Sequence, residues 1–136
     1  LDLDSENKKL TTKSVENIYM LKTGRLLQAS ILTPTYFKEL SEEKITALNG
    51  FSKAIGIAFQ IQDDIIEAEG DFETIGKSVE SDKNKNKAAY PILFGINQSK
   101  KRVEELYQKA CDSLSIFRGN SSSLEEMAKI IINRKL

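Results

Sequence analysis

The side chains with the clearest chemical potential lie in one apolar stretch, where oxygen-bearing residues recur at helical spacing. They are Gln60, Asp63, Asp64 and Glu67. All four fall within an arc of about 100° if the stretch is helical, because an α-helix turns about 100° per residue. Carboxylates this close repel one another unless a cation lies between them, and magnesium accepts one or two carboxylates together with substrate phosphates and water. An acidic, solvated helix face is the alternative interpretation.

An upstream lysine could supply the opposite charge. Lys22 shares an apolar stripe with Val15, Ile18 and Tyr19, and Thr23 follows it. A lysine on a face that packs against a core needs an anion. The alternative is a lysine whose ammonium reaches solvent at the edge of the stripe. We expect the same stripe to continue through Leu26 and Ala29.

Two further lysines, Lys77 and Lys87, belong to a polar segment that follows the acidic stretch. A diphosphate is commonly held between lysines on one side and magnesium-bound carboxylates on the other. Taken singly, each of these lysines is equally explained as a solvated surface charge.

Helices must position these groups, because apolar residues recur every three or four positions and strand alternation is not sustained. Pro91 predicts one further short turn of helix. The second long helix should be central, since its second half is apolar almost all round. We expect a loop over residues 70–87 and an all-α single domain. The expected long helices span residues 12–32, 41–69, 98–117 and 122–134.

The composition excludes several functional classes. The 136 residues include 20 Lys+Arg and 20 Asp+Glu, so a net charge of zero argues against nucleic acid as a partner. The absence of histidine excludes serine and cysteine triads and histidine-ligated zinc. Cys111 is expected to be a small buried thiol. No apolar stretch reaches membrane-spanning length and no signal peptide is apparent, so we expect a cytoplasmic protein.

Six ordered motifs resemble the carboxy-terminal half of class I trans-prenyltransferases, with bacterial farnesyl diphosphate synthases as the nearest match. The resemblance covers essentially the whole chain. It implies a partial isoprenoid synthase helical bundle whose family joins isopentenyl diphosphate to an allylic diphosphate with Mg²⁺, which draws off the leaving diphosphate. The motifs are residues 22–24 (KTG), 59–67 (FQIQDDIIE), 70–71 (GD), 74–77 (TIGK), 82 (D) and 87–91 (KAAYP).

The resemblance also implies roles for the acidic stretch. Asp63 and Asp64 correspond to the start of the second aspartate-rich motif, which holds magnesium against the allylic diphosphate. Glu67 replaces the usual third aspartate and is one methylene longer. Gln60 corresponds to a glutamine near the reacting carbons.

The basic residues receive roles in the same way. Lys22 and Thr23 correspond to residues that contact the allylic diphosphate and help to stabilise the cation. Lys77 and Lys87 match loop lysines that hold diphosphate. The pair at 134–135 matches a basic tail that covers the pocket in relatives. Asn86 and Glu80 stand where relatives have glycine, which predicts a less tightly turned loop.

The first aspartate-rich motif of the family and the residues that bind isopentenyl diphosphate have no counterpart in this chain. We therefore expect residues 1–136 to form the carboxy-terminal half of a synthase and to be inactive alone. The expected partners are the amino-terminal half and a second copy in a homodimer. The resemblance favours farnesyl diphosphate as product, although the residues that set chain length lie near the first motif.

Two other functions remain open. A class I terpene cyclase shares the fold, but the paired Asp63 and Asp64 with Lys77 and Lys87 suit chain elongation better than the mixed metal motif of cyclases. A non-catalytic helical subunit that modulates a complete synthase is the second alternative.

Overall fold

The computed structural model describes the backbone of residues 10–75 and 89–134 and the side chains of residues 10–70 and 89–134. These residues contain helices and no strand, which confirms the all-α fold class. The elements are α1 (Thr12–Tyr19), the π-helix η2 (Met20–Gly24), α2 (Arg25–Leu32), the 3₁₀-helix η3 (Thr33–Phe37), α3 (Glu42–Ile75), α4 (Tyr90–Phe94), α5 (Ile96–Ser113), the 3₁₀-helix η4 (Ser115–Phe117) and α6 (Ser122–Ile132).

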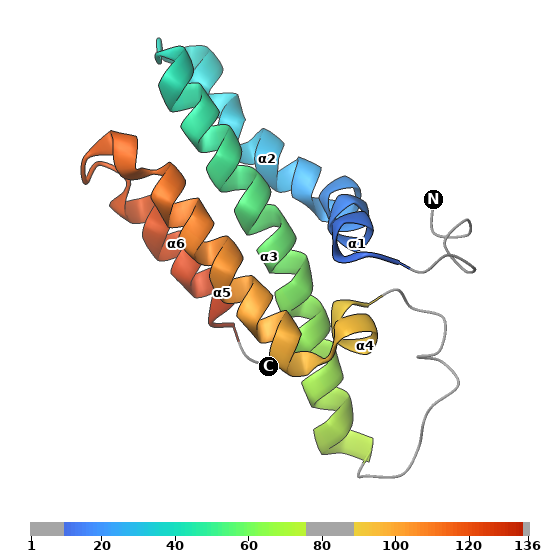
Figure 1. Ribbon diagram of the computed structural model, residues 1–136. Coiled ribbons are helices and arrows are strands. Elements are labelled where there is room, and N and C mark those ends of the chain that lie inside the picture. Colours follow the sequence, from blue (N-terminus) through green and yellow to red (C-terminus); the bar gives the residue numbers. More distant parts are fainter. Residues whose placement is uncertain (1–9, 76–88, 135–136) are drawn as a thin grey trace.

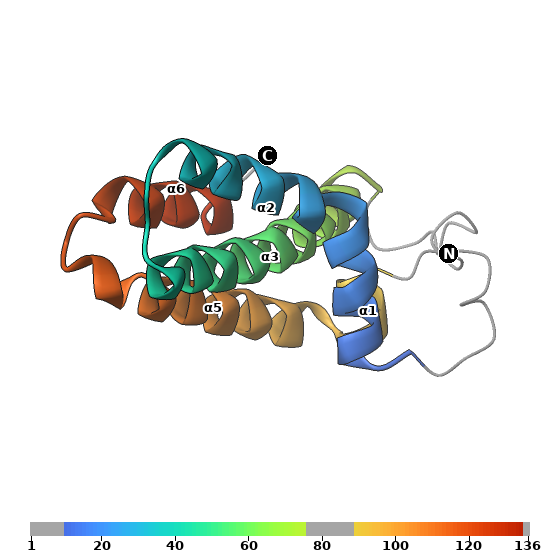
Figure 2. The same ribbon diagram turned by 90° about the horizontal axis from the view of Figure 1, so that it is seen from above.

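Helix α3 is the centre of the bundle, as its sequence predicts. In Figure 1, α1 and α2 lie along one side of α3 and α5 and α6 along the other, and Figure 2 shows α3 between α2 and α5. One face of α3 is fully buried at Phe51, Ile55, Ala58, Ile61 and Ile65. These residues recur every three or four positions, so burial of one continuous stripe stabilises the long helix.

Most predicted helix bounds are confirmed, but the end of the central helix is not. The expected terminus is Gly70, whereas α3 continues to Ile75. A glycine ends a helix by taking a positive φ, and among the described glycines only Gly95 and Gly119 do so. Gly70 stays helical, so the first residues of the expected loop belong to α3. The rest of that loop lies outside the described residues.

The first predicted helix covers the expected residues but contains a π turn. Buried positions step from Val15 to Tyr19 and then by five residues to Gly24, instead of by three or four. A π turn holds one extra residue, so the helix face downstream is displaced by one position. Leu26 is consequently 71% exposed, Ala29 is also exposed, and Gln28 is buried instead.

The prediction that Lys22 faces the core is wrong. Lys22 lies in the π segment, and its side chain is exposed. Cys111 also differs from expectation, since it is half-buried and contacts Tyr107. Within the described residues, none of the helices has both the length and the apolar character needed to cross a membrane.

Helix α3 crosses the π segment at a close approach of two glycines. A Cβ on Gly56 would lie 2.9 Å from Gly24 Cα, a distance at which backbone has to shift. Gly50, two turns earlier on α3, has a different neighbour, because its Cβ would lie 3.1 Å from Ser113 Oγ, at the end of a rotatable side chain. The two glycines on α3 therefore differ in what surrounds them.

We predict that Gly56→Ala lowers the free energy of unfolding by about 1–3 kcal/mol, because the new methyl group forces α3 away from the π segment. Gly50→Ala is the matched control and should be neutral or stabilising, since alanine favours a helix interior over glycine by about 1 kcal/mol. Urea unfolding followed by circular dichroism measures both. Equal effects of the two substitutions would contradict the close-approach explanation.

Candidate functional site

The predicted acidic residues lie together on the second half of α3, next to the buried Ile61 and Ile65. Asp63 and Asp64 are half-buried and Glu67 is exposed. Gln60 is buried, and its Nε2 donates to Asp63 Oδ2 at 3.4 Å. The structure thus gathers the residues that the helical spacing predicts, with their polar groups at the margin of the core.

Asp64 accepts hydrogen bonds from two segments far away in the sequence. The hydroxyl of Tyr19, on α1, donates to Asp64 Oδ2. The backbone N–H of Tyr90, the first residue of α4, donates to the same oxygen at 3.1 Å and to the Tyr19 hydroxyl at 2.8 Å. Both tyrosines are buried. One carboxylate oxygen therefore joins α1, α3 and α4.

The environment of Asp64 disfavours its negative charge. Burial raises the pKa of Asp64, the negative charge of Glu67 raises it further, and the two hydrogen bonds and the charge of Lys22 oppose the rise. Burial, together with the nearby Asp64 carboxylate, raises the pKa of Tyr19, so its hydroxyl stays protonated and acts as a donor. A cation near Asp64 would relieve the cost of its charge.

Asp63 is bound by the carboxy-terminal segment of the described chain. Arg134 Nη2 lies 2.7 Å from Asp63 Oδ1 and also donates to the Phe59 carbonyl oxygen at 3.2 Å. The guanidinium carbon lies 4.1 Å from the centroid of the Phe59 ring. Gln62 Nε2 donates to the Arg134 carbonyl oxygen at 3.1 Å. These contacts hold Arg134, two residues beyond the end of α6, against Asp63 and Phe59.

The predicted basic residues are only partly described. Lys22 and Thr23 lie in the π segment, and the charge of Lys22 is close enough to Asp64 to lower its pKa. Lys22 therefore acts on Asp64 from the exposed surface of the π segment, and its side chain does not enter the core. Lys77, Lys87 and Lys135 lie outside the described residues.

The acidic pair suits a hard dication bound together with a substrate. In the described part of the chain, no three acidic, histidine or cysteine side chains form a ready metal cage. Asp63 and Asp64 nevertheless offer oxygen donors from adjacent positions on one helix. Magnesium is typically held by one or two carboxylates, with water and substrate phosphates completing its shell, so these residues fit it.

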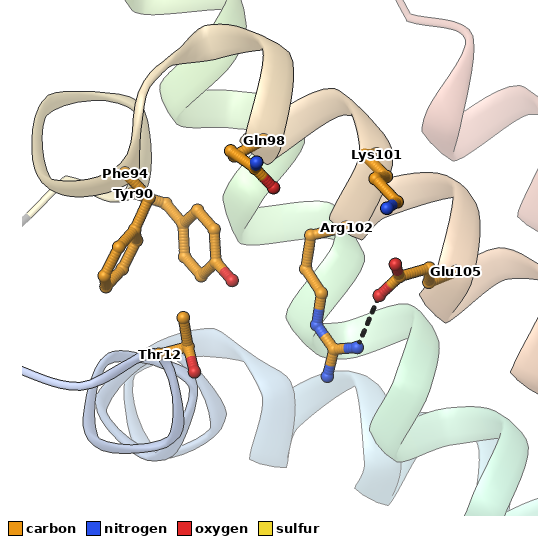
Figure 3. A pocket seen from close by; sticks show the side chains of 7 residues that line it. All are labelled: Thr12, Tyr90, Phe94, Gln98, Lys101, Arg102 and Glu105. Carbon is orange, nitrogen blue, oxygen red and sulfur yellow. Dashed lines mark hydrogen bonds and ion pairs between the residues drawn. The ribbon is translucent and has the colours of Figure 1, made fainter.

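A cavity of about 460 Å³ lies elsewhere, between α1, α4 and α5 (Figure 3). Arg102 projects into it and is held by Glu16 at 2.7 Å and by Glu105 at 3.0 Å. Its positive charge is therefore already compensated. The lining residues are Thr12, Tyr90, Phe94, Gln98, Lys101, Arg102 and Glu105, so the cavity does not include the acidic pair.

Sequence reasoning missed the part played by Tyr19 and Tyr90. Tyr19 lies on the expected apolar stripe, where an aromatic ring is explained by packing alone. Tyr90 belongs to the KAAYP motif, but its contribution comes from the backbone N–H, which carries no sequence signature. The one available signal is that a buried tyrosine needs a polar partner for its hydroxyl.

Comparison with known proteins places the chain in a family. The polyprenyl synthetase family model matches residues 1–118, and the chain belongs to this family. It is 35% identical to the farnesyl diphosphate synthase of Micrococcus luteus over 98% of this chain and 46% of that enzyme. It is 34% identical to the geranylgeranyl diphosphate synthase of Cyanophora paradoxa over 98% of this chain and 45% of that enzyme.

A solved structure confirms the isoprenoid synthase fold. A crystal structure from Marinomonas sp. MED121, assigned as a farnesyl-diphosphate synthase, matches with a TM-score of 0.76 at 33% identity. That match covers 97% of this chain and 44% of the other. The chain therefore spans about half the length of the relatives it matches.

We predict that Asp64→Asn raises the free energy of unfolding of the metal-free protein at about pH 7. The amide oxygen keeps both hydrogen bonds and the buried charge is removed. The pKa of Asp64 in the folded protein is raised above its unfolded value of 3.8. The stability of the wild type therefore falls as the pH rises from the unfolded pKa to the folded pKa. The advantage of the variant should shrink as the pH falls toward about 4.

Urea unfolding at several pH values measures this difference. Asp112→Asn, at an exposed position on α5, controls for the loss of one negative charge. If Asp64→Asn were less stable than wild type at neutral pH, the charge of Asp64 would not be penalised in the folded protein.

We predict that Arg134→Ala lowers the free energy of unfolding by about 1–2 kcal/mol, because it removes a charge-assisted hydrogen bond and the contact with Phe59 in a half-exposed setting. Lys129→Ala removes an exposed positive charge from α6 and should change stability by less than about 0.5 kcal/mol. Thermal unfolding compares the two variants. Equal losses would mean that the segment is not held by Arg134.

Proposed function

We propose that the protein containing this chain is a prenyltransferase that condenses an allylic diphosphate with isopentenyl diphosphate and releases farnesyl diphosphate. The observation that carries the proposal is the acidic pair, Asp63 and Asp64, held by hydrogen bonds at the centre of a polyprenyl synthetase fold. The relatives named above make prenyl diphosphates, which supports this class of reaction.

Asp63 and Asp64 would hold Mg²⁺ against the allylic diphosphate. When bound, the metal ion supplies charge neutralisation for the leaving diphosphate. The exposed Glu67 lies one turn further along α3 and, with its longer side chain, suits contact through water. Arg134 already neutralises Asp63 in this structure, so a dication and Arg134 would share that carboxylate.

The remaining site residues act on charge that develops during the reaction. Gln60 donates through Nε2 to Asp63, which leaves the negative end of its amide dipole, Oε1, for a developing carbocation. Lys22 and Thr23, with Lys77 and Lys87 from the segment outside the described residues, would bind the diphosphate. No described residue offers histidine as a base, so the released diphosphate would accept the final proton.

We further propose that this chain is the carboxy-terminal half of the synthase, on the strength of the order of its six motifs. The amino-terminal half would supply the first aspartate-rich motif, and a second copy would complete a dimer. Large exposed apolar side chains favour such partners. On α2 and η3 these are Leu26, Tyr36 and Phe37, which are 71%, 85% and 84% exposed. The 136-residue chain alone should not turn over.

We predict that the complete protein converts isopentenyl diphosphate and geranyl diphosphate to farnesyl diphosphate in a Mg²⁺-dependent reaction. Asp64→Asn should lower kcat by about 100-fold or more, because it removes a charge that the reaction needs while preserving the local hydrogen bonds. Asp112→Asn should leave kcat unchanged. Chromatography of radiolabelled products, with and without a chelator, measures both effects.

The same assay separates the alternatives. Cyclic hydrocarbon products would identify a terpene cyclase. A complete protein that makes no product, yet changes the rate of another synthase, would identify a partner subunit. Longer prenyl diphosphates would correct the proposed product while keeping the reaction.

A further inference from the structure

The roles proposed above leave the buried hydroxyl of Tyr19 without a function. Tyr19 is 5% exposed, its ring packs in the core beside Tyr90, and its hydroxyl donates to Asp64 Oδ2. A phenylalanine would fill the same space. The hydroxyl therefore has a polar role that packing does not explain.

The hydrogen bonds around Tyr19 fix the direction of one carboxylate. The Tyr19 hydroxyl and the Tyr90 N–H both bind Oδ2 of Asp64, and the Tyr90 N–H also binds the Tyr19 hydroxyl. Three groups from α1, α3 and α4 thus close a small triangle, and in Figure 1 these helices meet at the same part of the bundle. The hydrogen bonds to the two tyrosines use Oδ2, and neither of them involves Oδ1.

Such an arrangement is useful when the carboxylate must bind a cation. A free aspartate on a helix samples several rotamers, and it loses this freedom when it binds a metal ion. Groups that hold a ligand residue in place reduce this loss, and their removal commonly weakens metal binding about 10–100-fold. Tyr19 has the right properties, because its hydroxyl donates to Asp64 Oδ2 and its burial prevents water from replacing it.

We infer that Tyr19 is a positioning residue that orients Asp64 for a dication held with a diphosphate. This inference rests on the proposed function, in which Asp63 and Asp64 hold the metal ion. Tyr19 does not itself contact the metal ion or the substrate. It acts through Asp64, and it joins that carboxylate to the first residue of α4.

The chain offers a matched control. Tyr90 is also buried, at 3% exposure, and its ring lies 6.5 Å from that of Tyr19. Its side chain lines the same cavity as Arg102, and it is its backbone N–H that binds Asp64. Tyr19→Phe and Tyr90→Phe therefore remove the same atom from neighbouring buried rings, but only the first change releases Asp64.

The test is a titration of the complete protein with Mn²⁺ in the presence of inorganic pyrophosphate, with free Mn²⁺ measured by electron paramagnetic resonance. Tyr19→Phe should weaken the apparent Mn²⁺ affinity about 10-fold, and Tyr90→Phe should leave it within about 2-fold of wild type. In steady-state assays, the Mg²⁺ concentration for half-maximal rate should rise for Tyr19→Phe while the KM for isopentenyl diphosphate stays constant.

Asp64→Asn distinguishes the two ways of failing. If wild type and Asp64→Asn bind Mn²⁺ equally, the proposed metal site is wrong. If Asp64→Asn loses binding but Tyr19→Phe behaves as Tyr90→Phe does, the metal site stands and the inference about Tyr19 is overturned.

A measurement on the unsubstituted protein covers the case in which Tyr19→Phe does not fold. With ¹⁵N-tyrosine labelling, Mg²⁺ plus pyrophosphate should shift the amide resonance of Tyr90, because that N–H shares an oxygen with the liganded carboxylate. A Tyr90 resonance that stays unchanged while pyrophosphate and Mg²⁺ bind would also overturn the inference.

Discussion

A carboxylate at the margin of an apolar core is the constraint on which this half-bundle depends. In the proposed function Asp64 uses its negative charge to attract a cation, yet it lies on the helix that provides the largest share of the core. Two donors from distant segments offset part of the cost of that burial, because a buried hydrogen bond to a charged group is stronger than a neutral one. The tertiary structure at this end of α3 is therefore organised around one oxygen atom, Asp64 Oδ2.

The neighbouring Asp63 has different partners, and the contrast bears on the metal site proposed above. Asp63 meets a positive charge, Arg134, that remains partly in water. Asp64 meets neutral donors inside the protein. Asp63 can therefore exchange one cation for another at low cost, while the orientation of Asp64 is preserved. An acidic pair with one adaptable and one fixed member accommodates changes in the charge of its ligand.

The sequence predicts the elements of this fold well, because helical periodicity is a local property. The run at residues 54–62, apolar almost all round, is enough to identify α3 as central. The arc from Gln60 to Glu67 is enough to place the acidic residues together. The end of α3 could not be read from Gly70, because glycine is compatible both with a helix end and with a costly interior position. Neighbours 26 to 71 residues apart, such as the Asp64 and Arg134 contacts, leave no local pattern.

The π turn shows how a residue can be added to a packed helix without repacking it. The apolar pattern before the turn matches the pattern after it once a single residue is set aside, so residues 20–23 contain one surplus position relative to an ordinary helix. Lys22 and Thr23 both lie in this stretch. A deletion of one residue there would leave a continuous α-helix whose buried residues still share one face. A deletion elsewhere in α1 or α2 would rotate the buried residues on one side of the deletion relative to those on the other. The packing of the bundle and the side chains at residues 20–23 are thus separable, so that natural variation in this turn can change those side chains while sparing the core.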